Sequence, residues 1–256
     1  MDPSDLGPEA LNTAKTIAKV TGQGLEIVKD SGAFVSRFIG GSLEQGFGII
    51  EDKLKYLRWE RHVRLMDRAN AFMAERGSHM RFRPVPLNVA IPIFEAASLE
   101  EDDDLQDLWA RLLVNAADAE SGIEVKRRLV TILQDFSYME ARLLQKIHDA
   151  PPMKSNVSTK SVPGPLDVDG RLIARPMKGD VPTKGLPNEY LEPGEEEEDP
   201  GLPPEPVQIG LWNLMRLGCI DSAGTWDSLT GIRRVKITVL GKALVNACST
   251  GLRHLT

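Results

Sequence analysis

The sequence predicts a mainly α protein, with a helical N-terminal and central region followed by a small winged-helix-like α/β unit. Two observations predict this class. Apolar residues of segment 105–116 recur at the spacing of one buried helical face. Segment 207–256 has the pattern of a helix that ends at Gly218, a strand, a polar turn, a second strand, and a helix capped by Thr238.

Residues 1–76 form the first predicted domain, a glycine-rich helical region followed by a long helix over 51–75. Each glycine inside a helix costs about 1 kcal/mol relative to alanine, so the many glycines before residue 50 favour helix breaks, close helix packing or a lipid-facing surface. Two interpretations of 31–50 stay open: a hairpin packed on the core, and an effector segment that contacts a membrane. The second would use three phenylalanines, Phe34, Phe38 and Phe47.

The long helix carries apolar side chains in a heptad-like spacing, which is typical of a short self-association seam. These residues are Tyr56, Trp59, Val63, Met66 and Met73. Because fewer than four heptads are present, the same pattern also fits packing within the fold. The basic residues of this helix have acidic neighbours and predict a solvated face more than a phosphate or lipid-headgroup patch.

Residues 77–150 form the predicted central helical unit. Its first prolines predict an extended segment that leads into a helix start, where Ser98 and Glu101 have the spacing of a capping box. Further helices are expected over 121–136 and 138–148, and the second of these also begins with a capping-box pattern.

One run of the central unit carries the most specific pattern of the chain: Val89-Ala90-x-Pro92, Glu95-Ala96-Ala97-Ser98, Asp104-Leu105, and Leu108-Trp109-Ala110-x-Leu112-Leu113-x-Asn115-Ala116. Weaker patterns follow at 136–144 and 237–241. In these residues the sequence resembles the Abi-alpha (abortive infection alpha) family of bacterial phage-defence proteins. The resemblance implies a role in phage resistance and transfers no catalytic residue.

Residues 151–206 have the composition of a long loop or disordered insertion. They hold twelve of the seventeen prolines and an acidic run at 195–199, which predicts a solvated segment. Leu172 and Ile173 are the candidates for one short strand within it.

Residues 207–256 form the predicted winged-helix-like unit, with helix 138–148 as a candidate first helix. This segment has six basic and two acidic side chains, whereas the whole chain has a net charge of −6. Because an acidic chain is repelled by phosphate backbones, nucleic-acid contact is expected only here. The candidate contacts beside the wing are Arg233, Arg234 and Lys236.

The sequence has few residues in patterns typical of catalytic or metal-binding sites. The four histidines are isolated, and no zinc, nucleophile-elbow or P-loop pattern is present, so we expect no enzyme activity, no cofactor and no metal site. Cys219 and Cys248 lie among apolar residues, which predicts buried, reduced thiols. The first residues lack the pattern of a signal peptide, so a cytoplasmic location is expected, with membrane association left open.

Two functional hypotheses follow. In the first, the chain is a non-enzymatic phage-defence protein that acts through contacts with a protein partner, a second copy of itself or a membrane surface. In the second, it is a winged-helix regulator that binds nucleic acid. Neither hypothesis requires a small-molecule substrate.

Overall fold

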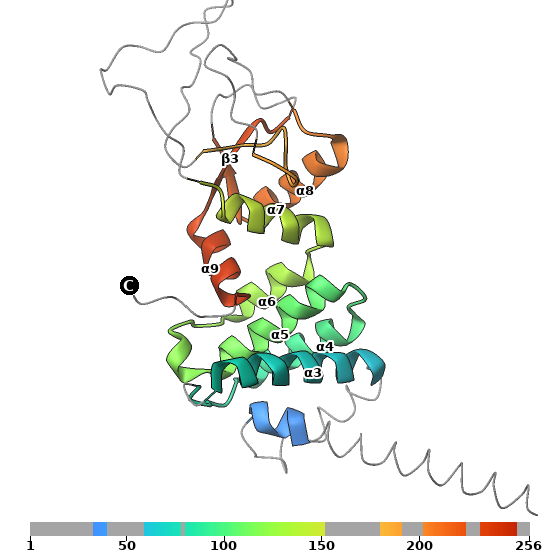
Figure 1. The fold of residues 1–256 in the computed structure, drawn as a ribbon, viewed down its shortest axis with the longest axis vertical. Coiled ribbons are helices and arrows are strands. Elements are labelled where there is room, and N and C mark those ends of the chain that lie inside the picture. The colour runs from blue at the N-terminus through green and yellow to red at the C-terminus, as the bar shows by residue number, and fades with distance from the viewer. Residues whose placement is uncertain are drawn as a thin grey trace, which may run out of the picture.

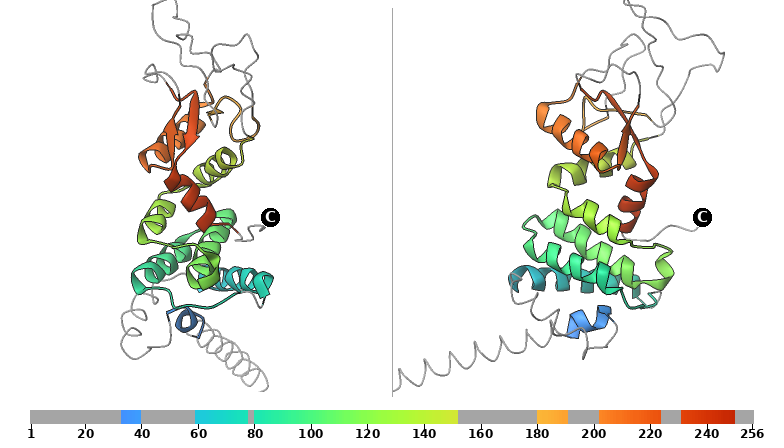
Figure 2. Two further views of the ribbon diagram at one scale, coloured as in Figure 1. Left: turned by 90° about the vertical axis from the view of Figure 1, so that its left-hand side faces the viewer. Right: turned by 180° about the vertical axis from the view of Figure 1, so that it is seen from behind.

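The computed structural model describes residues 33–39, 59–77, 80–151, 180–190, 202–223 and 231–249. It confirms the mainly α class with a small antiparallel sheet near the C-terminal end. Two groups of elements are stacked along the long axis of the molecule (Figures 1 and 2). The first group holds α3 (Trp59–Arg76), α4 (Leu87–Leu99), α5 (Asp103–Ala117) and α6 (Arg127–Gln134). The second holds α7 (Tyr138–His148), α8 (Glu205–Arg216), β1 (Val181–Pro182), β2 (Ile220–Ser222) and β3 (Arg234–Ile237).

The last helix, α9 (Val239–Ala247), runs back from the sheet toward the first group (Figure 1). It contacts both α7 and α5, and α5 also contacts α7. The two groups therefore meet at α5, α7 and α9. Helix α7, which follows the first group in sequence, packs mainly against α8, β3 and α9.

Helix α3 packs along α5 and α4, so the predicted boundary at residue 76 separates it in sequence from helices with which it shares a core. Its buried face consists of His62, Leu65, Ala69 and Met73. These positions follow the 3.6-residue helical period. The predicted helix over 51–58 lies outside the described residues.

Helix α4 contradicts the expectation of an extended segment. It runs from Leu87 to Leu99 with Pro92 inside it and Pro86 at its N-cap. Its buried residues are Val89, Ala90, Ile93, Phe94, Ala97 and Ser98, which share one helical face. Pro92 is the sixth residue of the helix. The apolar face of α4 packs against α5 and α6. Burial of that face therefore outweighs the hydrogen bond lost at the proline.

The predicted capping box at Ser98 and Glu101 is wrong. Ser98 is buried inside α4, where its hydroxyl donates to the Glu95 carbonyl oxygen at 2.7 Å. The N-cap of α5 is Asp102, whose side chain accepts a hydrogen bond from the Leu105 backbone N–H at 3.0 Å. Both residues suit an N-cap, but tertiary packing keeps Ser98 in the preceding helix.

Helix α6 is shorter than the predicted helix over 121–136. A 3-10 turn over Ala119–Ser121 ends at Gly122, whose φ of 64° lies in the left-handed region, and the helix begins only at Arg127. The capping box of α7 is confirmed. Ser137 and Glu140 bond reciprocally at its start, with the Ser137 N–H donating to Glu140 Oε2 at 2.9 Å.

The sheet has the order β1-β3-β2, and both pairings are antiparallel. In the register, Val181 lies opposite Val235 and Ile220 lies opposite Ile237. The sequence did not predict β1, which comes from the segment expected to be a loop or disordered. Residues 180–190 instead join the fold, while the expected strand at 172–173 and the acidic run lie outside the described residues.

The described parts of the chain between α8 and α9 follow the predicted pattern, and residues 224–230 of the predicted polar turn lie outside the described residues. Gly218 has φ 74° just after α8, and the Thr238 hydroxyl accepts from the Gly241 N–H at 3.0 Å as the N-cap of α9. The predicted free, buried state of Cys219 and Cys248 is confirmed. Burial raises the pKa of Cys219 to about 11 and that of Cys248 to about 12, so both thiols stay protonated at neutral pH.

Candidate functional site

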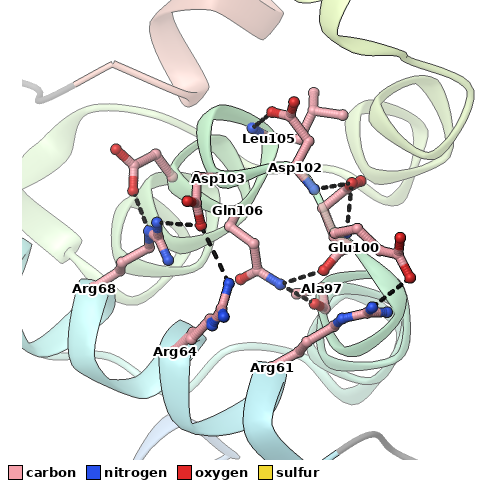
Figure 3. A network of polar contacts seen from close by, with 11 residues as sticks. Arg61, Arg64, Arg68, Ala97, Glu100, Asp102, Asp103, Leu105 and Gln106 are labelled. Atoms are coloured by element: carbon pink, nitrogen blue, oxygen red, sulfur yellow. Dashed lines mark hydrogen bonds and ion pairs between the residues drawn. The ribbon is translucent and has the colours of Figure 1, made fainter.

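A row of arginines on α3 binds the acidic start of α5 (Figure 3). Arg68 donates to Asp103 at 2.9 Å and to Asp107 at 2.5 Å, and Arg64 reaches Asp103 at 3.4 Å. Arg61 donates to the Leu99 carbonyl oxygen at 2.9 Å. Burial opposes the charge of Arg68, yet the hydrogen bonds that it donates to Asp107 and Asp103 raise its pKa.

These pairs show that the basic side of α3 within 61–68 is an interhelical contact, where the sequence predicted a solvated face. Arg61 also pairs with Glu101. The amide of Gln106, at the centre of the same contact, donates to the carbonyl oxygens of Ala97 and Glu100. These contacts join α3 to the end of α4 and to the acidic start of α5 (Figure 3).

A second buried polar contact joins α3, α5 and α9. Arg76 donates to Asp118 Oδ2 at 2.9 Å and to Asn115 Oδ1 at 2.5 Å. The Asn115 amide in turn donates to the carbonyl oxygens of Ala247 at 2.7 Å and Ser249 at 2.9 Å. Asn115 therefore satisfies carbonyl groups at the end of α9, which have no partner within that helix.

Phe34 and Phe38, two of the predicted membrane contacts, lie in the core. Phe38 is 0% exposed, and its ring centroid lies 4.8 Å from that of Phe34 and 5.3 Å from that of Phe82. The ring of Phe94 from α4 is 6.2 Å from Phe34. In this structure these two rings pack within the protein, as in the first interpretation of 31–50. Phe47 lies outside the described residues.

The predicted self-association residues do not form one exposed seam. Met73 is buried in the core, while Val63 and Met66 are half-buried. Leu65, which the heptad pattern omitted, is fully buried instead. Tyr56 and the side chain of Trp59 lie outside the described residues.

The three basic residues of the predicted nucleic-acid contact differ in their surroundings. Lys236 is exposed on β3, whereas Arg233 and Arg234 are half-buried. Burial lowers the pKa of Arg234, and the charge of the buried Asp180 opposes that shift. Arg234 therefore faces an acidic interior group, which leaves Lys236 as the exposed cation of the three.

The outer face of α8 carries a stripe of apolar residues that the sequence analysis did not single out. Ile209 is 62% exposed and Trp212 is 46% exposed. They lie three residues apart, so they are neighbours on one face of the helix, next to the exposed Pro206. The buried residues of α8 lie on its other side, which is why the helical period alone did not distinguish the two faces.

A cavity of about 230 Å³ lies where the two groups of helices meet. Its lining comes from α5, α6, α7 and α9, with Phe136 and Cys248 at their ends. Most of its apolar lining residues are buried, whereas the charged lining residues of α5 and α7 are exposed or half-buried and therefore lie at its mouth. No single segment of the sequence contains this site.

The described ranges hold no group of three His, Cys, Asp or Glu side chains that could bind a metal ion. Of the histidines there, His62 is buried beside Phe34 and Phe94, and His148 pairs with Asp149 at 2.9 Å. Among these same residues, no helix has both the length and the apolar character needed to cross a membrane.

Comparison with known proteins gives one match. Neither the curated proteins nor the solved structures contain a match to this chain. The sequence model of the family described as abortive infection alpha matches residues 60–248. This span begins in α3 and extends just beyond the last residue of α9. The chain therefore belongs to the abortive infection alpha family, which indicates a role in abortive infection, a defence against phage.

Proposed function

We propose that this chain is a non-enzymatic phage-defence protein that acts by binding another protein through the outer face of α8. The observation that carries the proposal is the exposed pair Ile209 and Trp212. Single exposed apolar residues are common on soluble proteins, but a tryptophan beside an isoleucine on one helix face is typical of binding surfaces. Membership of the abortive infection alpha family supplies the biological setting.

The surroundings of this stripe favour a protein partner over a lipid surface. Glu205 lies at one end of the stripe, and the ion pair between Arg216 and Asp135, at 3.0 Å, lies at the other. Interfacial helices carry a dense Lys/Arg face, whereas these charges are mixed and few. An apolar centre with a mixed polar rim is the usual composition of a protein interface.

Phage plating tests the proposal. Cells would express the intact chain, an Ile209→Ser/Trp212→Ser variant, or a matched Leu87→Ser/Leu99→Ser variant that removes exposed apolar residues from α4. Protein level and melting temperature are measured for each. We expect the α8 variant to lose protection while keeping its stability, and the α4 variant to protect. Full protection by a folded α8 variant would contradict the proposal.

A second candidate function is nucleic-acid binding by the C-terminal unit. The order α7, β1, α8, β2, β3 and the exposed Lys236 favour it. Because each neutralised phosphate contributes a slope of about −0.9 to log K against log salt, a contact by Arg233 and Lys236 predicts a slope near −2 for duplex DNA. An Arg233→Gln/Lys236→Gln variant should then flatten the slope. Binding by the intact chain that does not depend on salt would exclude this function.

A further inference from the structure

The cavity between the two groups of helices has an apolar interior and no assigned occupant. Its volume is about 230 Å³. The larger apolar residues of the lining are Leu108, Leu133, Phe136, Leu144, Leu244 and Val245. A cavity of about 150 Å³ holds a benzene ring, and a water molecule has a share of about 30 Å³ in the liquid. The space therefore fits one six-membered ring or a branched aliphatic group and roughly three further non-hydrogen atoms.

The charged side chains at the mouth of the cavity differ in whether their hydrogen-bonding groups already have partners. Asp107 already accepts a hydrogen bond from Arg68 at 2.5 Å. Arg111, half-buried beside it, stacks on the ring of Phe72 at 4.5 Å and donates no hydrogen bond to any residue that the structure describes. A guanidinium has five N–H donors. Those of Arg111 are available to an acceptor that enters the cavity.

Arg142 of α7 adds a second cation to the lining. It lies over the ring of Tyr138 at 5.4 Å, and its hydrogen bond to Asn188 is long, at 3.5 Å. Asp104 is the remaining carboxylate of the mouth, and it is exposed in the first turn of α5, where the helix dipole favours its charge. The mouth thus offers two guanidinium groups and one solvated carboxylate.

The charge of Arg111 also reaches the inner wall. It lowers the pKa of Cys248, although burial has the larger and opposite effect. Arg111 and Cys248 both line the cavity, so the guanidinium lies beside the space between α5 and α9.

We propose that this cavity binds a small monocarboxylate with an aromatic or branched aliphatic body. The body fills the apolar interior, and the carboxylate accepts hydrogen bonds from Arg111 at the mouth. A planar carboxylate matches the fork of a guanidinium and forms two parallel hydrogen bonds with it. The occupant contacts helices of both groups, so it holds them together and raises the melting temperature. This site is separate from the outer face of α8 and does not depend on its function.

Three probes that share a phenyl ring and differ in their polar group test the proposal on the full chain. They are phenylacetate, phenylacetamide and phenethylamine. Saturation-transfer NMR and thermal melting measure their binding. We expect phenylacetate to bind about tenfold more tightly than the neutral amide, because the amide cannot form charge-assisted hydrogen bonds with Arg111. Equal binding of the amide, or stronger binding of the cationic amine through Asp104, would overturn the proposal.

Two variants locate the binding. Arg111→Gln removes the guanidinium and should weaken phenylacetate about tenfold. Val245→Phe fills the interior and should abolish binding of the whole series. Arg128→Gln, on an exposed position of α6, is the matched control and should change nothing. Unchanged phenylacetate binding by the Arg111 variant, or no saturable binding of phenylacetate, benzoate or 3-methylbutanoate by the unmodified chain, would exclude the site.

Discussion

The amide nitrogen of Asn115 in α5 lies 2.7 Å from the carbonyl oxygen of Ala247 at the end of α9. These residues are 132 positions apart in sequence, and the contact is buried. A side-chain amide that serves a distant helix end ties the position of α9 to the first group of helices.

Replacement of Asn115 by alanine should therefore destabilise the protein. The change removes one hydrogen-bond acceptor of Arg76 and leaves the carbonyl groups of Ala247 and Ser249 without the amide that donates to them, which costs about 2–4 kcal/mol in the free energy of unfolding. Denaturant titration measures the loss, and hydrogen exchange should show faster opening of α9. Asn70→Ala, on the exposed face of α3, should change stability by less than about 0.5 kcal/mol. Unaltered exchange in α9 would contradict the assigned role.

Gly241 permits the close approach of α9 to the chain before β2. A Cβ atom added there would lie 2.1 Å from the Cys219 carbonyl oxygen, which is backbone and cannot rotate away. Gly241→Ala should cost at least about 2 kcal/mol, measured by denaturant titration.

Gly210→Ala provides the comparison. Its Cβ would meet the end of the Leu143 side chain at 2.8 Å, which can shift, and alanine gains about 1 kcal/mol of helix propensity. The cost should therefore be clearly smaller than at Gly241. The reverse order of the two losses would be inconsistent with this account of the contact.

The arginine row of α3 should contribute unequally along its length. Arg68 is 24% exposed and binds two carboxylates, so Arg68→Gln should cost about 1 kcal/mol, and the cost should fall in high salt. Arg81 is 81% exposed and pairs with Glu120 only at 3.4 Å. Arg81→Gln should therefore leave the melting temperature unchanged. Equal effects of the two variants would indicate that the α3 pairs add nothing beyond surface charge.

His62 should make stability depend on pH. Burial lowers its pKa from 6.5 to about 4, so the unfolded chain binds a proton at a higher pH than the folded protein does. The stabilisation is fully present above pH 6.5 and is lost as the pH falls toward about 4, by roughly 3 kcal/mol in all. His62→Gln should remove this slope from unfolding measured across that range, whereas His148→Gln should keep most of it. A slope that survives in the His62 variant would assign it to other groups.

The sequence correctly predicted the helix caps and turns that depend on only a few neighbouring residues. The capping box of α7, the Thr238 cap of α9 and the glycine after α8 are each complete within four residues, and each is confirmed. The start of α5 was placed wrongly because Ser98 and Asp102 both suit an N-cap. Burial of α4 against α5 and α6, which no local pattern reveals, decided between them.

The candidate sites were harder to predict because their residues come from distant segments. Arg68 and Asp107 are 39 positions apart, although the arginines at 61, 64 and 68 and the acidic residues at 103 and 107 each have the spacing of one helical face, a pattern that indicates facing helices. Phe34 and Phe38 illustrate a different limit. The apolar pattern of a core helix and that of a membrane-contacting helix are the same when the partner surface is unknown.

The edge strand β1 protects β3 from pairing with strands of other molecules. The composition of its segment predicts only a loop or disorder. The strand covers one side of β3, and its second residue, Pro182, has no N–H to offer a foreign strand. A shortened protein from which 151–206 had been removed as a dispensable linker would leave β3 with an unpaired edge. Such edges recruit strands from other molecules, so that version should aggregate, because residues 181–182 would no longer cover this edge of β3.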